Sequence, residues 1–325
     1  MSIKDSDSIQ ASAVTERPRT SGPAAGFATK RRSSGLLRIE RRDGWLFTMP
    51  FILGVLFFWI GPMLYSLYMV LHSWNMISAP AFIGASNITE LAADPLVGTS
   101  LWNTAYYTFI GVPLGLVTSF LAALALNAPI KGRSFYRTAL YLPAITPAVA
   151  SAVIWIQMLN PEFGVINSFL SWFGIPPVSW LYDPLAAKPA FILMSLWGIG
   201  PQMIIFLAAL QNVPQELVEA AQIDGASGWD SFWNVTIPMV SPSLLFNFTM
   251  GIIGSFQVFT SSFVMTRGGP QNATLFMVLY LYDTAFLRFR MGYACTLAWL
   301  LFCIIMAVTF IQLRITNRWV YYEMG

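Results

Sequence analysis

The sequence predicts an all-α integral membrane protein. Of its 325 residues, 56% are hydrophobic and only 10% are charged, whereas a soluble domain carries about 25% charged residues. Six separate apolar runs each contain the roughly 20 residues that an α-helix needs to cross a bilayer. We therefore expect six transmembrane helices joined by short polar loops.

The first 44 residues predict a polar tail. Residues 1–44 are rich in Ser, Pro, Ala and Gly and show no hydrophobic period, which is typical of a disordered cytoplasmic segment. The tail ends in "KRRSSGLLRIERRDG", whose basic residues are typical of the cytoplasmic side of a span. The apolar run that follows is too long for the core of a signal peptide.

The transmembrane domain is expected over residues 45–315, and a short cytoplasmic tail over 316–325. We place its spans at about 46–71, 99–126, 138–159, 189–210, 240–264 and 291–313. A further apolar segment, 272–287, would reach only about 24 Å as a helix, short of the ~30 Å bilayer core. It also contains Asp283. We interpret it as a re-entrant or interfacial segment.

Lys and Arg set the orientation. With six spans and a cytoplasmic N-terminus, 14 of the 18 Lys and Arg residues lie on the cytoplasmic side. This excess is the one that cytoplasmic loops carry in membrane proteins. Both termini, and the loop at about 212–239 between spans four and five, are therefore predicted to be cytoplasmic.

Several kinds of chemistry are excluded by what the sequence lacks. His72 is the only histidine, and no cluster of Cys and His exists, so no metal site is predicted. No Lys follows a Gly, so there is no phosphate-binding loop for ATP. Cys295 and Cys303 would lie ~12 Å apart along a helix, too far for a disulfide. We expect no catalytic residue, no bound cofactor and no nucleic-acid partner.

The loop at 212–239 reads as a rigid pair of short helices. Pro214 can begin a helix through "QELVEAAQI", on which Leu217, Ala220, Ala221 and Asp224 share one face. The two alanines allow another surface to approach the backbone. Packing on the protein's own spans and docking of a cytoplasmic partner remain equally open from the physics alone.

The second half of the loop carries turn and cap signals. Gly225 can adopt the positive φ of a turn, and Ser227 with Asp230 forms a capping-box pattern. The helix that follows has an apolar face of Trp229, Phe232 and Trp233. Pro238 and Pro242 then mark the start of span five.

The stretch "EAAQIDGASGWDSFWNVTIP" resembles the EAA loop of ABC-importer permeases, of the form E-A-A-x-x-x-G-x9-I-x-L-P. Three other segments are similar to the carbohydrate-type group of these permeases, which handles maltose, lactose and glycerol phosphate. They are "RSFYRTALYLPAITPAVASAVIW", "LWGIGPQMIIFLAALQNVPQELVEAAQIDGA" and "VMTRGGPQNATLFMVLYLYDTAF". The resemblance spans about residues 43–320 and departs at Pro201, where many members have Phe.

The resemblance implies a set of partners. They are a homologous second permease, a cytoplasmic ATPase dimer that binds ATP and Mg²⁺, and an extracytoplasmic solute-binding protein. In such permeases the loop docks into a cleft on the ATPase. The coupling residues it implies here are Glu219, Ala220, Ala221, Asp224, Gly225, Trp229 and Pro238. The expected function is import of a sugar or oligosaccharide across the cytoplasmic membrane, or alternatively of a related polyol or glycerol-phosphate-type solute.

A break in span four indicates where a solute could pass. Gly198, Gly200 and Pro201 predict a kink, and irregular backbone inside a membrane lines a cavity or is buried in protein. Polar or aromatic residues near it and on span five are candidates for the solute pathway. These candidates are Trp197, Gln202, Asn247, Gln257 and Thr260.

Each polar candidate could instead hydrogen-bond between spans. Pro143 and Pro147 in span three could be hinges or plain kinks. No Lys or Arg lies deep in a span, which favours a neutral solute.

Two other classes are less favoured. A stand-alone secondary transporter would need ionisable residues inside its spans, and Asp283 is the only candidate. A membrane enzyme would need a nucleophile and base or metal ligands, which the sequence does not supply.

Overall fold

The computed structural model describes residues 34–316, with side chains described from Glu40 onward. Two units are distinguished, one ending at Trp59 and the other beginning at Ile60. Helix α1 (Ser34–Val55) begins ten residues before the predicted end of the tail. Its first turns read "SGLLRIERRD", in which Leu, Arg and Glu are strong helix formers. The tail prediction for residues 1–33, and that for 317–325, lies outside the described residues.

Four helical stretches are long and apolar enough to cross a membrane. The first runs through α1, the π-helical turn η1 (Leu56–Ile60) and α2 (Gly61–Met69). The second is α4 (Pro95–Asn127), and the fourth is α15 (Met291–Thr316). The third joins α11 (Gly228–Ser231), η2 (Phe232–Thr236) and α12 (Ile237–Phe256) to α13 (Thr260–Met265).

Two further candidate spans are broken helices. α5 (Arg133–Ile145) and α6 (Ala148–Met158) meet at 102°, and α8 (Pro184–Trp197) and α9 (Gly200–Gln211) meet at 49°. The break expected in span four is therefore present, and Pro201 lies in the first turn of α9. Counted as one span each, the two pairs bring the described candidates to six.

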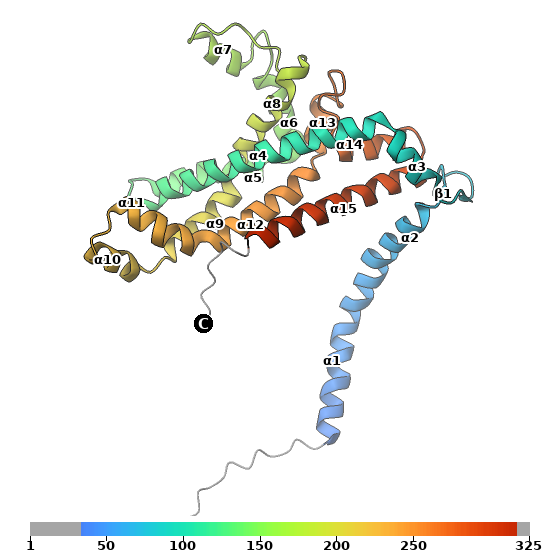
Figure 1. The fold of residues 1–325 in the computed structure, drawn as a ribbon, viewed down its shortest axis with the longest axis horizontal. Helices are drawn as coiled ribbons and strands as arrows, with labels where there is room; N and C mark the ends of the chain where they lie inside the picture. Colours follow the sequence, from blue (N-terminus) through green and yellow to red (C-terminus); the bar gives the residue numbers. More distant parts are fainter. Residues whose placement is uncertain (1–33, 317–325) are drawn as a thin grey trace, which may run out of the picture. The chain divides into compact units, whose positions relative to one another are not determined.

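Helix α4 lies at the centre of the second unit. It packs against α8, α9 and α12, and α12 packs in turn against α15 (Figure 1). One buried cluster joins residues of α4, α12, α14 and α15, and a second joins α4 to α9 and α12. A third joins Trp155 of α6 and Phe191 of α8 to Phe276, the residue that precedes α14.

The remaining elements are short. A hairpin pairs β1 (His72–Ser73) with β2 (Ala81–Phe82) and precedes α3 (Ser86–Ala93), while α7 (Val165–Ser171) follows α6. Helix α10 (Gln215–Ile223) precedes α11. The segment 272–287 is helical only over α14 (Met277–Tyr282) and η3 (Asp283–Leu287), a length of about 16 Å. It is too short to span, as the sequence predicted.

Candidate functional site

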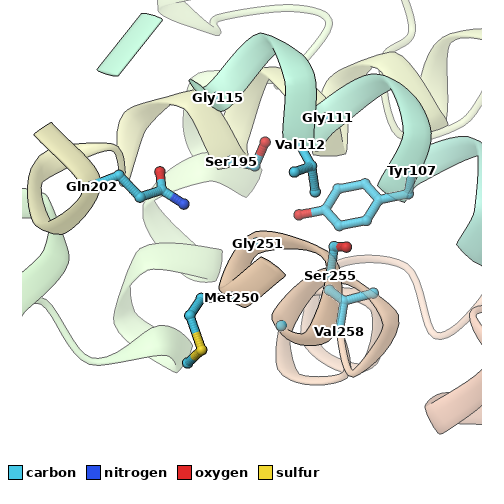
Figure 2. Close-up of a pocket in the computed structure, with 11 residues that line it drawn as sticks. Tyr107, Gly111, Val112, Gly115, Ser195, Gln202, Met250, Gly251, Ser255 and Val258 are labelled. Atoms are coloured by element: carbon cyan, nitrogen blue, oxygen red, sulfur yellow. The ribbon is translucent and has the colours of Figure 1, made fainter. Parts of the chain in front are cut away.

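Two adjoining cavities lie where α4, α8, α9 and α12 meet. Their volumes are about 280 Å³ and 320 Å³, and both are lined by Tyr107, Ser195 and Val258. Figure 2 shows Tyr107, Ser195 and Ser255 converging on one space, with Gln202 and Met250 at its other side. The second cavity continues toward the bend between α5 and α6, where Pro143 and Ala148 line it.

Glycines create the first cavity. A Cβ on Gly115 of α4 or Gly254 of α12 would meet no atom within 4 Å, so both residues leave open space. At Gly251, by contrast, a Cβ would lie 2.9 Å from Val112 Cγ1. Helices α4 and α12 therefore touch closely at Gly251, and Gly115 and Gly254 leave open space beside that contact.

Uncharged polar groups face these cavities. The Tyr107 hydroxyl and the Ser195 side chain both line the two cavities. Ser255 Oγ donates to Thr108 Oγ1 at 2.9 Å, across the α4–α12 contact. Among the described residues that line the two cavities, none is Asp, Glu, Lys or Arg. The surface suits a neutral ligand rich in hydroxyl groups.

The structure brings together some of the pathway residues predicted from the sequence. Gln202 lines the first cavity, and Trp197 and Thr260 line the second. Asn247 is 1% exposed and donates to the Gln202 backbone oxygen at 3.4 Å, so it supports the cavity wall from behind. Gln257 is exposed at the end of α12 and lines neither cavity.

Sequence reasoning missed Tyr107, Ser195 and the glycines. Helix α4 is apolar along its whole length, so its pattern gives no sign of which face meets the cavity. Gly111 and Gly115 of α4 are four residues apart, a spacing that indicates a small-residue face for helix packing. The sequence does not show which helix packs against that face.

The loop at 212–239 has the predicted local structure. Helix α10 covers "QELVEAAQI", and Gly225 has a φ of +92°. The Ser227 N–H donates to Asp230 Oδ2 at 3.0 Å, and the Asp230 N–H donates to Ser227 Oγ at 3.2 Å, which completes the capping box. Pro238 lies in the first turn of α12.

This loop is exposed and acidic. Four carboxylates, those of Glu216, Glu219, Asp224 and Asp230, lie on it, and no Lys or Arg occurs between residues 189 and 266. None of the four is ion-paired among the described residues. Large apolar side chains are exposed beside them, with Ile223 at 86% and Trp229 at 68%. We call residues 212–239 the acidic loop.

Trp229 belongs to an aromatic group. It stacks on Phe232 with ring centroids 5.7 Å apart, and Trp233 meets both edge-on. Phe232 in turn faces Phe120 of α4 at 6.4 Å. Behind this group a cleft of about 530 Å³ separates α10 from the ends of α4 and α9. Aromatic contacts thus join the acidic loop to the end of α4, and the cleft lies beside them.

The opposite end of the bundle is held by its own side chains. Asp94, which caps α4, accepts hydrogen bonds from the hydroxyls of Tyr280 and Tyr293. Arg290 binds Glu90 through two bonds of 2.6 and 2.5 Å. Partial burial raises the pKa of Asp94, but these hydrogen bonds outweigh it and hold that pKa below the ordinary 3.8. We call this region, residues 86–104 with 262–293, the braced end.

A family model described as "Binding-protein-dependent transport system inner membrane component" matches residues 111–320. The chain belongs to this family. The resemblance inferred from the EAA-like loop is confirmed. The matched residues include α8, α9 and α12, which form walls of the two cavities, and the whole acidic loop of the permease.

Curated relatives extend the similarity to nearly the full permease. It is 38% identical over 307 residues to the probable ABC transporter permease protein YesP of Bacillus subtilis (strain 168), covering 93% of this chain and 98% of that one. It is 35% identical to the lactose transport system permease protein LacF of Rhizobium radiobacter, covering 88% and 97%. It is 33% identical to the arabinooligosaccharides transport system permease protein AraP of Bacillus subtilis (strain 168), covering 93% and 98%.

A solved structure shares the fold of the permease. It is a bacterial ABC transporter involved in the import of the acidic polysaccharide alginate. One of its chains superposes with a TM-score of 0.75 at 23% identity, covering 87% of this chain and 99% of that one.

Proposed function

We propose that this permease is the transmembrane subunit of an ABC importer that carries a neutral sugar or oligosaccharide into the cell. The observation that carries the proposal is the pair of uncharged cavities beside the break between α8 and α9. Relatives named for lactose, arabinooligosaccharides and trehalose or maltose support it.

The cavity chemistry fits a saccharide. Its hydroxyl groups would exchange hydrogen bonds with Tyr107, Ser195, Gln202 and Ser255, and its C–H faces would lie against Trp197. Pockets for small ligands have this pattern of apolar walls and a few placed polar groups. A glycerol-phosphate-type solute is disfavoured, because a buried phosphate requires a cationic partner and no described lining residue supplies one.

The acidic loop is proposed to dock the ATPase on the cytoplasmic side. Glu219 and Asp224 would meet polar or basic groups, Ala220 and Ala221 would allow close approach, and Gly225 would make the turn. Trp229 and Pro238 would connect the docked helix to α12. ATP and Mg²⁺ would bind on the ATPase dimer, since the permease has no phosphate loop. A homologous second permease and an extracytoplasmic solute-binding protein complete the complex.

This arrangement requires six spans with both termini in the cytoplasm. Introduced cysteines at Asn272 and Arg290, in a variant lacking Cys295 and Cys303, should both react with a membrane-impermeant reagent from outside. Reaction from opposite sides would restore a seventh span through 272–287.

The function is tested with the assembled complex. The permease is co-purified with its ATPase and second permease, reconstituted in vesicles, and supplied with the solute-binding protein. We expect ATP-dependent uptake of a neutral oligosaccharide, and no ATP hydrolysis by the permease alone. ATP hydrolysis by the isolated permease, or uptake without any ATPase subunit, would overturn the proposal.

A further inference from the structure

A layer of apolar side chains closes one side of the second cavity. Phe276 is fully buried between Tyr107 of α4 and Phe191 of α8, with ring centroids 5.3 and 5.7 Å away. Trp155 of α6 and Leu159, the residue that follows this helix, complete the layer and are 4% and 1% exposed. Four elements that are distant in sequence therefore meet at one ring.

The layer lies on the braced side of the cavities. Along α4, Tyr107 belongs to the layer, whereas Gly111 and Gly115, which lie one and two turns further from the braced end, line the first cavity. Along α8, Phe191 belongs to the layer and Ser195 follows one turn further in. In the proposed orientation the layer separates the cavities from the outside.

Phe276 is held in place by the loop that precedes it. Asn103 of α4 is 2% exposed and donates to the backbone oxygens of Asn272 and Leu275 at 2.7 and 3.2 Å. Thr104 Oγ1 accepts from the Met277 N–H at 3.0 Å. These bonds fix the backbone on both sides of Phe276 to α4.

The loop itself is rigid. Ser262 donates to the Thr274 backbone oxygen at 2.6 Å, and Thr274 Oγ1 donates to the Gly269 oxygen at 2.7 Å. Arg267, Gln271 and Asn272 have positive φ values of 49°, 49° and 61°. Residues other than glycine seldom adopt this backbone conformation, and it persists only where the surrounding structure imposes it. The segment "TRGGPQNAT", residues 266–274, thus builds a support for Phe276.

Among the described residues, a single polar side-chain contact ties α8 to this support. Lys188 Nζ donates to Asn103 Oδ1 at 3.1 Å and lies 5.3 Å from the Tyr106 ring centroid. Phe191 follows Lys188 by three residues, which places it on the same side of α8. Movement of α8 away from α4 would therefore break the Lys188–Asn103 bond and draw Phe191 off Phe276.

We propose that Phe276 is the outer gating residue of the permease, fixed on α4 by Asn103 and Thr104, and that the solute enters when α8 carries Phe191 away from it. The proposal rests on the proposed function for the direction of transport. The layer is built from aromatic and aliphatic side chains whose polar groups are the Tyr107 hydroxyl and the Trp155 indole N–H, so a hydroxyl-rich solute would lose most of its hydrogen bonds to water in crossing it. The Lys188–Asn103 bond then stabilises the closed state, and water replaces it when the layer opens.

The first test measures access to the cavity. In right-side-out vesicles holding the full complex, a Gly254→Cys reporter is labelled with an impermeant thiol reagent, in a variant where Cys295→Ser and Cys303→Ser remove the native thiols. Gly254 lines the first cavity and has room for the added atoms. Phe276→Ala should raise the labelling rate roughly tenfold, because it increases the population of open states.

Phe263→Ala is the matched control. Phe263 stacks on Phe259 at 5.2 Å and contacts Tyr282, so it is an aromatic residue of the same region that does not belong to the layer. It should leave the labelling rate within about twofold of the parent. Equal labelling of both variants, or no increase in Phe276→Ala, would overturn the gate. If the labelling differs as expected but the parent complex takes up no saccharide, the proposed function fails and the gate stands.

A second test does not depend on the alanine variant folding. Phe191→Cys and Phe276→Cys are combined and joined by a short bifunctional thiol reagent in the assembled complex. Joining them should abolish saccharide uptake, and reduction of the link should restore it. Full uptake by the completely linked complex would overturn the proposal.

Discussion

At the braced end, polar side chains find their partners within the chain. Asn103 reaches residues 169 and 172 positions away, and Arg290 reaches Glu90 across 200 positions. In the acidic loop, the polar contacts are local, such as Asn234 Nδ2 to the Asp230 backbone oxygen four residues earlier. One end is thus complete in the single chain, while the other presents its charges to solvent.

This difference indicates that the braced end stabilises the fold, whereas the acidic loop is available to bind a partner. A buried polar group without a partner costs roughly 1–3 kcal/mol, so the braced end must stay satisfied for the fold to persist. Exposed carboxylates contribute little to the fold, and they remain available to a partner of opposite charge. Substitutions at the two ends should therefore have opposite consequences for unfolding and for assembly.

The largest expected effect is on assembly, from the acidic loop. Glu219→Lys reverses a charge where a partner is expected, which costs about 2–5 kcal/mol at comparable interfaces. ATPase retention and solute-stimulated hydrolysis should fall by more than about 30-fold, while thermal unfolding of the permease stays unchanged. Gly225→Asp should behave alike, since a side chain disfavours the φ of +92°. Glu162→Lys makes the same charge change on an exposed residue elsewhere and should retain full uptake. Normal uptake by both loop variants would remove the distinction between the ends.

The next effect is on stability, from the braced end. Asn103→Leu leaves two backbone oxygens and the Lys188 ammonium without their partner, at a cost of about 3 kcal/mol. Asn234→Leu in the acidic loop removes one exposed local bond and should cost less than about 0.5 kcal/mol. Thermal unfolding of the two purified variants measures the difference. Equal destabilisation would mean that both ends are held in the same way.

A smaller effect is expected between the two ends. Gln202→Ala removes a polar group from the cavity wall, which should weaken solute affinity by about 0.5–1.5 kcal/mol, at most roughly tenfold. Assembly and thermal unfolding should not change. Gln211→Ala, an exposed residue at the end of the same helix, is the control for uptake. An affinity equal to that of the parent would return Gln202 to a packing role.

The smallest effect is the response to acid. Because the folded pKa of Asp94 is below 3.8, its ionisation stabilises the folded state above that pH, and the contribution is lost as the pH falls through the folded value. Below about pH 4 the unfolding temperature should therefore fall more steeply in the parent than in Asp94→Asn. Parallel curves would show that Asp94 does not stabilise the braced end through its charge.

Local features were predictable because they depend on residues close in sequence. The bounds of α10, the turn at Gly225, the Ser227–Asp230 cap and the break at Gly198–Pro201 each follow from a short pattern. The helix-forming residues after Ser34 are also a local signal for the start of α1. The polar composition of residues 1–44 favoured a disordered tail instead, so this start was not predicted.

The cavity and the braced end could not be predicted in this way. Tyr107 and Ser195 become neighbours only because α8 packs against α4, and Thr108 meets Ser255 across 147 positions. Asn247 and Gln257 show the converse limit. Their polarity suggested that both line the solute pathway. Their positions around the axis of α12 instead bury Asn247 behind the cavity wall and leave Gln257 exposed.

The close contact of Gly251 with Val112 fixes the distance between α12 and α4 at one level of the bundle. A Cβ at Gly251 would lie 2.9 Å from Val112 Cγ1, so no side chain fits there without a shift of its neighbour. One helical stretch runs from Gly228 in the acidic loop to this contact, a length of about 35 Å at 1.5 Å per residue, and Ser255 follows about 6 Å further on. A displacement along the axis of this stretch would therefore reach the cavity wall through a single helix, without passing through a flexible loop.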